Sequence, residues 1–188
     1  GLRDMDAILG RDDRLVAKLV DAADKIDANF AAIVGTPVPA VIGTDYQALK
    51  RMCEKKTDLP ILAIDTDGME LYDKGEEKAY LALFTAFAKE KYEVCKEKVG
   101  ILGMTPQDVS DLKAADKVRE ELKKEGKEAI CYGMGDGLEA VERASEVGKN
   151  IVVSAAALEV AKYLEKTFGT PYEIGYPAAG ELVPNLDR

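Results

Sequence analysis

Apolar residues follow two alternating patterns along the chain, one typical of helices and the other typical of short buried strands. Between residues 13 and 27, apolar side chains recur every three or four positions, which predicts an amphipathic helix. The apolar run at 30–34, followed by Gly35-Thr36-Pro37, indicates a buried strand that ends in a loop. The pattern restarts at 99–103, and further strands are expected at 60–64, 129–132, 150–154 and 172–174.

Polar residues and glycines predict where the intervening helices begin and end. Thr44 and Gln47 form a capping-box pattern, and Thr105-Pro106 suits the start of another helix. The last helix is expected to stop at Gly169. A long helix after residue 68 is expected to face inward with Ala79, Tyr80, Leu83, Phe84, Phe87 and Val94.

Strands separated by helices require crossover connections, so the sheets should be mostly parallel and covered on both faces. We therefore expect an α/β fold with two Rossmann-like three-layer units, divided into residues 1–97 and 98–188. In such sheets ligands bind beyond the carboxyl ends of the strands. This rule directs attention to the loops at 35–44, 65–75, 103–107, 133–137 and 154–156.

The charge balance excludes two classes of partner. The 188 residues carry 35 acidic and 26 basic side chains, a formal net charge of −9, so nucleic acids and anionic membranes would be repelled. No apolar run approaches the roughly 20 residues needed to span a bilayer. The chain starts with Gly1 inside what looks like mid-domain sequence, which suggests a piece of a longer protein.

Histidine is absent from the sequence, which removes Ser-His-Asp and Cys-His triads and histidine-ligated zinc from consideration. The three cysteines, Cys53, Cys95 and Cys131, are scattered and form no paired motif. This usage indicates a reduced cytoplasmic protein rather than a disulfide-stabilised one. Cys53 and Cys95 are expected on apolar helix faces and Cys131 in a strand, where each would act as a small hydrophobic residue.

Two loops invite a chemical interpretation. Asp65-Thr66-Asp67-Gly68 follows an apolar strand and looks like the nucleophile loop of haloacid dehalogenase-type phosphatases, with Ser154 as a second phosphate-binding position. Met69 departs from that pattern, and a carboxylate pair there also suits a turn. Gly133-Met134-Gly135-Asp136-Gly137 would let a backbone approach an anion at a helix start, but it lacks a full GxGxxG motif and also suits a plain turn.

Taken in order, short segments throughout the chain resemble the nitrogenase component 1 family. In the first half they are Asp6–Gly10, Ile33–Pro37, Val41–Asp45 and the Asp67–Met69 turn. In the second half they are Val99–Gly103, Gly133–Gly137, Asn150–Ser154 and Leu164–Tyr172. Each segment is weak evidence alone, whereas the ordered set is fairly specific and covers nearly the whole chain.

The resemblance implies a reductive, iron–sulfur-dependent oxidoreductase. Members of the family are usually longer, have three α/β domains, pair with a second component 1-type subunit and receive electrons from an ATP-driven reductase. This chain would correspond to the back part of the first domain and the middle domain. The complete protein would hold an iron–sulfur cluster or a tetrapyrrole.

Departures from the family pattern bear on the cofactor. Pro37 stands where the family places a cluster-binding cysteine, and Ser154 stands where the catalytic nitrogenase subunit binds its cofactor through cysteine. Proline cannot ligate iron, because such clusters need thiolate sulfur. We therefore expect no metal ligands and no cofactor within this piece, which alone should be inactive.

A site, if formed, is expected in the cleft between the two units. The residues placed to line it, as cofactor- or substrate-binding groups, are Thr36, Pro37, Asp67, Gly135, Asp136 and Ser154. Turn and helix-cap roles are the alternative for each of them, and Ser154 before three alanines suits an N-cap. Two other functions stay open: a non-catalytic binding or subunit-assembly module on the same fold, and the phosphatase that uses Asp65 and Asp67.

Overall fold

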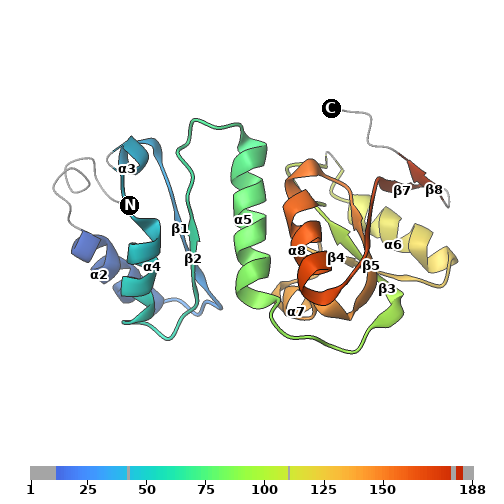
Figure 1. Cartoon of the computed structure of the whole chain (residues 1–188), viewed down its shortest axis with the longest axis horizontal. Coiled ribbons are helices and arrows are strands. Elements are labelled where there is room, and N and C mark those ends of the chain that lie inside the picture. Colours follow the sequence, from blue (N-terminus) through green and yellow to red (C-terminus); the bar gives the residue numbers. More distant parts are fainter. Residues whose placement is uncertain (1–11, 42, 110, 179–180, 184–188) are drawn as a thin grey trace. The chain divides into compact units, whose positions relative to one another are not determined.

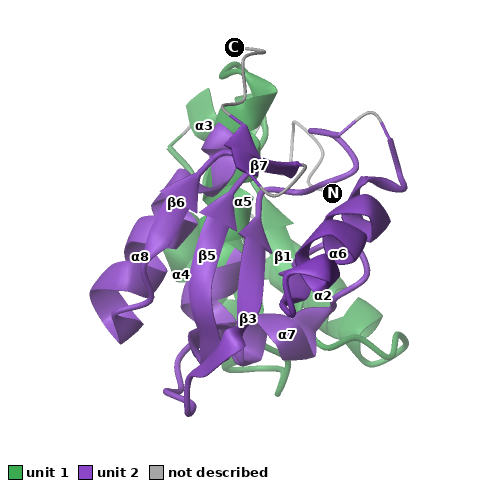
Figure 2. Cartoon of the chain, turned by 90° about the vertical axis from the view of Figure 1, so that its right-hand side faces the viewer, with its two compact units in different colours: residues 1–82 green, residues 83–188 purple. Residues whose placement is uncertain are grey.

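The chain is divided into two compact units, residues 1–82 and 83–188 (Figure 2). The computed structural model describes residues 12–41, 43–109, 111–178 and 181–183. Figure 1 shows helices alternating with strands throughout. The division falls earlier than the predicted boundary at 97/98, which lies inside a strand. The α/β class expected from the sequence is confirmed.

Unit 1 contains a parallel two-stranded sheet and the helices around it. In chain order its elements are α2 (Asp12–Ala23), β1 (Ala31–Val34), α3 (Pro37–Val41), α4 (Tyr46–Glu54), β2 (Ile61–Ile64) and the first part of α5 (Tyr72–Phe87). Ala31 pairs with Ile61, and the register continues to Val34 and Ile64. The core cluster on one face is formed by Val16, Ile33, Tyr46, Leu49, Cys53 and Ile61.

Two local details of unit 1 differ from the sequence expectation. The residues after β1 form the short helix α3 rather than a loop; proline at its first position is compatible with that start. The capping box at Thr44 was wrong, because α4 begins one residue later than expected. Asp45 is the N-cap, and its side chain accepts the N–H of Ala48 at 2.9 Å.

The boundary between the units lies within α5. Phe84, near the end of this helix, is fully buried and meets the ring of Tyr132 edge-on, with 5.2 Å between ring centroids. The Tyr163 hydroxyl donates to the carbonyl of Ala88 at 2.9 Å, just past the helix. Both contacts tie the residues after position 82 to unit 2. Val94, expected on the buried face of the helix, lies beyond it and is half-exposed.

Unit 2 is built on a parallel sheet of four strands in the order β4-β3-β5-β6. Its first elements are β3 (Cys95–Leu102), α6 (Ala114–Lys124), β4 (Glu128–Cys131), α7 (Leu138–Glu142) and the 3₁₀ turn η1 (Ala144–Glu146). They are followed by β5 (Val147–Val152), η2 (Ala155–Ala157), α8 (Leu158–Phe168) and β6 (Tyr172–Ile174). An antiparallel hairpin of β7 (Tyr176–Ala178) and β8 (Glu181–Val183) comes last.

The two faces of this sheet carry different side chains. Val99, Ile101 and Ile151 pack with α6 in one buried cluster. Gly100 and Asn150 alternate with these residues, so they face the opposite side. α6 and α8 lie on either side of β3 and β5 (Figure 2), which gives the three layers expected for this unit.

Asn150 is an unusual member of the buried sheet. It is fully buried, and its amide oxygen and nitrogen have no hydrogen-bond partner in the described part of the chain. A Cβ atom on Gly100 would lie 2.1 Å from the Asn150 Oδ1 atom. Glycine at position 100 therefore makes room for the polar side chain.

Several boundaries in unit 2 refine the prediction. The last helix ends at Gly169, which adopts a left-handed conformation (φ 80°) as the sequence predicts. α6 starts at Ala114, later than Thr105-Pro106 predicts, and Leu112 is exposed. The terminal hairpin was not predicted. None of the helices in the described ranges combines the length and apolar character that a membrane crossing requires.

Candidate functional site

The six predicted site residues fall into two groups, one in each unit. Thr36, Pro37 and Asp67 belong to unit 1, whereas Gly135, Asp136 and Ser154 belong to unit 2. In each group the residues lie just beyond the carboxyl ends of two strands, β1 and β2 in unit 1 and β4 and β5 in unit 2. A common cleft lined by all six stays a prediction, so the two groups are described separately.

In unit 1 the ends of β1 and β2 are held together by Gly35 and Thr66. The Gly35 N–H donates to the carbonyl of Ile64 at 2.9 Å, and the Thr66 hydroxyl donates to the carbonyl of Gly35 at 2.9 Å. A Cβ atom on residue 35 would lie 2.0 Å from the Thr66 carbonyl oxygen. Only glycine permits this approach of the two backbones.

The residue that replaces the expected cluster cysteine, Pro37, lies against the turn after β2. A Cβ atom on Gly68 would be 2.8 Å from Cδ of Pro37, and Gly68 itself has a positive φ of 70°. The structure thus brings Pro37 and the Asp67-Gly68 turn together. Thr36 is exposed, and its carbonyl accepts the N–H of Ala40 in α3 at 3.1 Å.

Asp67 forms a tight turn. Its Oδ1 atom accepts the N–H groups of Met69 at 2.8 Å and of Glu70 at 3.1 Å. These donors hold the pKa of Asp67 below its ordinary value, since they stabilise the charged form. Both N–H contacts are those of a turn cap, so the geometry favours the turn interpretation over the phosphatase one.

A hollow of about 260 Å³ lies beside this turn, at the carboxyl ends of β1 and β2. Val34, Ile64, Leu71 and Tyr72 are its large apolar lining residues, and Gly75 and Ala79 of α5 line it as well. Asp67 and Glu70 stand among its polar lining residues. Of the loops expected from the sequence to carry a site, 65–75 lies next to this hollow.

In unit 2 the glycine-rich loop after β4 is fastened to α6 by Arg119. The Asp136 Oδ2 atom accepts the N–H of Cys131 at 2.7 Å and a guanidinium N–H of Arg119 at 2.8 Å. Arg119 also donates to the carbonyl of Met134 at 2.8 Å. A side chain on Gly135, which has φ 108°, would collide with the guanidinium. These contacts hold the loop in a fixed turn, and Gly135 and Asp136 line a hollow of unit 2.

Ser154 has the capping role that its position before three alanines predicts. Its hydroxyl accepts the N–H of Ala156 at 3.3 Å, at the start of η2. The side chain is buried, and a Cβ atom on Gly103 would lie 2.7 Å from the Ser154 Cβ atom. The ends of β3 and β5 therefore lie close together at this point.

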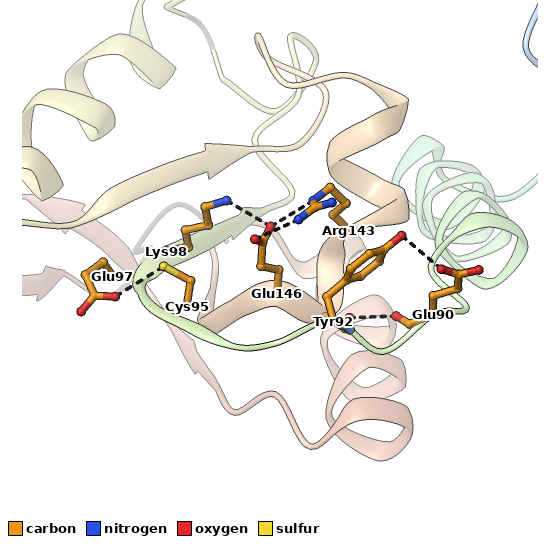
Figure 3. A network of polar contacts seen from close by, with 8 residues as sticks. Glu90, Tyr92, Cys95, Glu97, Lys98, Arg143 and Glu146 are labelled. Carbon is orange, nitrogen blue, oxygen red and sulfur yellow. Dashed lines mark hydrogen bonds and ion pairs between the residues drawn. The ribbon is translucent and has the colours of Figure 1, made fainter.

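A second hollow, of about 320 Å³, lies beside β4 and α7 in unit 2. Glu146 on its wall binds the Lys98 ammonium at 3.0 Å and receives two N–H groups of Arg143, at 3.1 and 3.2 Å (Figure 3). Arg143 first, and Lys98 next, hold the pKa of Glu146 below its ordinary value. Arg143 also stacks 4.6 Å above the Tyr92 ring. No pattern in the sequence indicated this network, whose members lie up to 54 positions apart.

The cysteines lie apart from each other. Cys53 and Cys131 are fully buried, and burial raises the pKa of both thiols, that of Cys131 to about 11. Cys95 lies in β3, not on the helix predicted for it, and its thiol donates to Glu97 at 3.4 Å (Figure 3). Within the described ranges, no three or more histidine, cysteine or acidic side chains are grouped to hold a metal ion.

Comparisons with known proteins identify relatives that match most of the chain. A family model described as nitrogenase component 1 type oxidoreductase matches residues 1–178. None of the curated protein sequences matches the chain. Among solved structures, nitrogenase Cp1 at pH 5 aligns with 18% identity and a TM-score of 0.73, over 92% of this chain and 35% of that one.

The structure of nitrogenase Cp1 at pH 6.5 gives a similar result. It aligns with 18% identity and a TM-score of 0.75, again over 92% of this chain. At this level of identity the likeness demonstrates a shared fold. The chain spans 34% of the length of this Cp1 chain, about a third.

Proposed function

Because the chain belongs to the family of nitrogenase component 1-type oxidoreductases, we propose that it forms part of the α/β framework of such an enzyme and holds no cluster of its own. Unit 1 would supply the back part of the family's first domain, and unit 2 the middle domain. The reductive chemistry would then reside in other parts of a larger protein or in a partner subunit.

The placement of the thiols is the observation that carries this proposal. Cys53 and Cys131 are fully buried in the cores of different units, packed among apolar side chains, so the two thiols are not grouped as ligands of one cluster. Cys95 alone could provide a single ligand. Three free thiols also suit the reducing cytoplasm, where we place the protein.

The residues at the strand ends do not fit an iron–sulfur cluster. Pro37 has no donor atom in its side chain, and the hydroxyl of Ser154 is engaged in capping η2. Thr36, Asp67, Gly135 and Asp136 would instead orient a substrate or a neighbouring subunit by hydrogen bonding. In the complete enzyme, a second component 1-type subunit and an ATP-driven reductase would supply the cluster and its electrons.

Iron and acid-labile sulfide, measured on the anaerobically purified chain, test the proposal. We expect neither above background, and no change in the visible spectrum on adding dithionite. The Cys95→Ser variant is the matched control, because it removes the only thiol that is not buried. Stoichiometric iron in the natural chain that disappears in Cys95→Ser would show a cluster at that position and overturn the proposal.

A further inference from the structure

Large apolar side chains are exposed around the hollow of unit 1. Met69 is 80% exposed, Leu71 76%, Tyr72 64% and Val34 56%. Single exposed apolar residues are common on protein surfaces, but a group of them around a concave site indicates a binding surface. Val34, Leu71 and Tyr72 line the hollow directly.

The hollow is lined by two small residues of α5, Gly75 and Ala79, which are one helical turn apart. A Cβ atom on Gly75 would touch only the Thr66 methyl group, at an ordinary distance of 3.7 Å. There is therefore room beside Gly75 for a larger side chain, within a hollow of about 260 Å³.

The rim of the hollow is acidic. Among the residues that line the hollow, Asp67 and Glu70 are acidic and none is basic. Glu70 forms an ion pair with Lys78 at 2.6 Å, and the charges of Asp65 and Asp67 act on the same ammonium group. One lysine thus faces three carboxylates, which leaves an excess of negative charge beside the apolar surface.

We propose that this hollow docks a basic amphipathic segment of a partner protein. A large apolar side chain of the segment enters above Gly75 and Ala79 and packs on Leu71 and Tyr72. Lysine or arginine residues on the same face of the segment pair with the carboxylates of the rim. This is the helix-in-groove mode of recognition, in which apolar anchors give affinity and charge gives selectivity.

Charge selects this occupant over the alternatives. A second copy of the chain would also carry a net charge of −9 and would be repelled, as would any acidic partner. A purely apolar segment would leave the excess carboxylates of the rim unpaired. The inference goes beyond the proposed framework role, because a chain with no cluster could dock such a segment equally well.

A fluorescein-labelled helical peptide of leucine, lysine and one phenylalanine, about 18 residues long, is the probe. Its binding to the full chain is followed by fluorescence anisotropy. We expect saturable binding that weakens as salt is raised from about 50 to about 300 mM. A peptide with glutamate in place of lysine should not bind. Absence of saturable binding, or equal binding of both peptides, overturns the proposal.

Gly75→Leu fills the hollow without straining the backbone, and glycine is a poor helix former, so this variant should fold. We expect it to bind the lysine peptide at least about tenfold more weakly, with an unchanged or higher melting temperature. The control Leu112→Ala alters an equally exposed apolar residue of unit 2 and should bind within about twofold of the natural chain.

Asp65→Asn should weaken binding by about threefold, whereas Asp21→Asn, on the exposed surface of α2, should have no effect. Binding by Gly75→Leu that equals that of the natural chain would overturn the proposal. So would sedimentation evidence that the natural chain self-associates and Gly75→Leu does not, because the hollow would then bind a second copy.

Discussion

Units 1 and 2 both alternate helices with parallel strands, but unit 2 joins four strands into one sheet and unit 1 joins two. In unit 2 the loops at the strand ends are held by Arg119 and Asp136 and by the Ser154 cap, and the hollow beside β4 is lined largely by charged and polar residues. In unit 1 the strand ends border an apolar hollow with exposed side chains around it. The same alternation of helices and strands thus gives two units whose hollows differ in chemical character.

This difference suggests that unit 2 matters mainly for folding and that the hollow of unit 1 matters mainly for binding. A sheet of two strands is marginal alone, so the sheet of unit 1 depends on its packing against helices. Unit 2 has the larger buried core, around Ile101, Val118 and Ile151. We expect perturbations in unit 2 to act mainly on folding and those at the hollow of unit 1 to act mainly on binding.

The largest effect is expected for Phe84→Ala. This ring is fully buried against Tyr132, and its removal leaves a cavity that should lower the free energy of unfolding by about 3–5 kcal/mol. Leu71→Ala, at the exposed rim of the hollow, should change it by less than about 0.5 kcal/mol. Urea titrations followed by circular dichroism measure both free energies of unfolding. Equal losses for the two variants would contradict the contrast between the units.

Asp136→Ala should have the next largest effect. The change removes the acceptor of the Cys131 N–H and the Arg119 guanidinium, which should cost about 2–3 kcal/mol in the same titration. Asp67→Ala in unit 1 removes a turn cap that is open to water, and should cost less than Asp136→Ala. A reversed order would mean that the turn of unit 1, not that of unit 2, is the more important for folding.

Asn150→Leu is expected to stabilise the protein. The buried amide lacks a partner in the described residues, so a side chain of similar shape without polar atoms should raise the free energy of unfolding by about 1 kcal/mol. Thermal unfolding measures the change, with Asn150→Ala as the control that leaves a cavity. A lower melting temperature for Asn150→Leu would show that a bound water molecule satisfies the amide.

The smallest effect concerns pH. The pKa of Asp67 is lowered by the N–H groups of Met69 and Glu70. Its contribution to stability is therefore present above the ordinary value of 3.8 and is lost as pH falls through the lower value of the folded state. Asp67→Asn should reduce the drop in melting temperature between about pH 5 and pH 2.5. An unchanged drop would mean that the turn does not depend on the charge.

Periodicity was sufficient to predict most helices and strands, and thereby the fold class. Ser154 and Gly169 could be placed as caps because their roles depend on neighbours in sequence. The role of Arg119 could not be foreseen, because its partners Met134 and Asp136 are brought to it only by the packing of α6 on β4. A basic residue next to the buried Val118 was the only available signal.

Two units were expected from the sequence, but no sequence pattern indicates a boundary within α5. α5 is one uninterrupted helix, so no turn residue marks the point where its contacts change from unit 1 to unit 2. The hollow of unit 1 lies beside the predicted loop 65–75 and is lined by Asp67, but the sequence did not indicate that Leu71 and Tyr72 are exposed beside it.

Hydrogen exchange of the native chain, followed by mass spectrometry, tests the contrast between the units most directly. We expect the amides of β3 and β5 to exchange at least about tenfold more slowly than those of β1 and β2, because unit 1 has the smaller sheet and the more exposed surface. Addition of the lysine peptide should then protect 64–79 selectively. Equal protection of the two sheets in the free chain would contradict the view that the four-stranded sheet of unit 2 is more stable than the two-stranded sheet of unit 1.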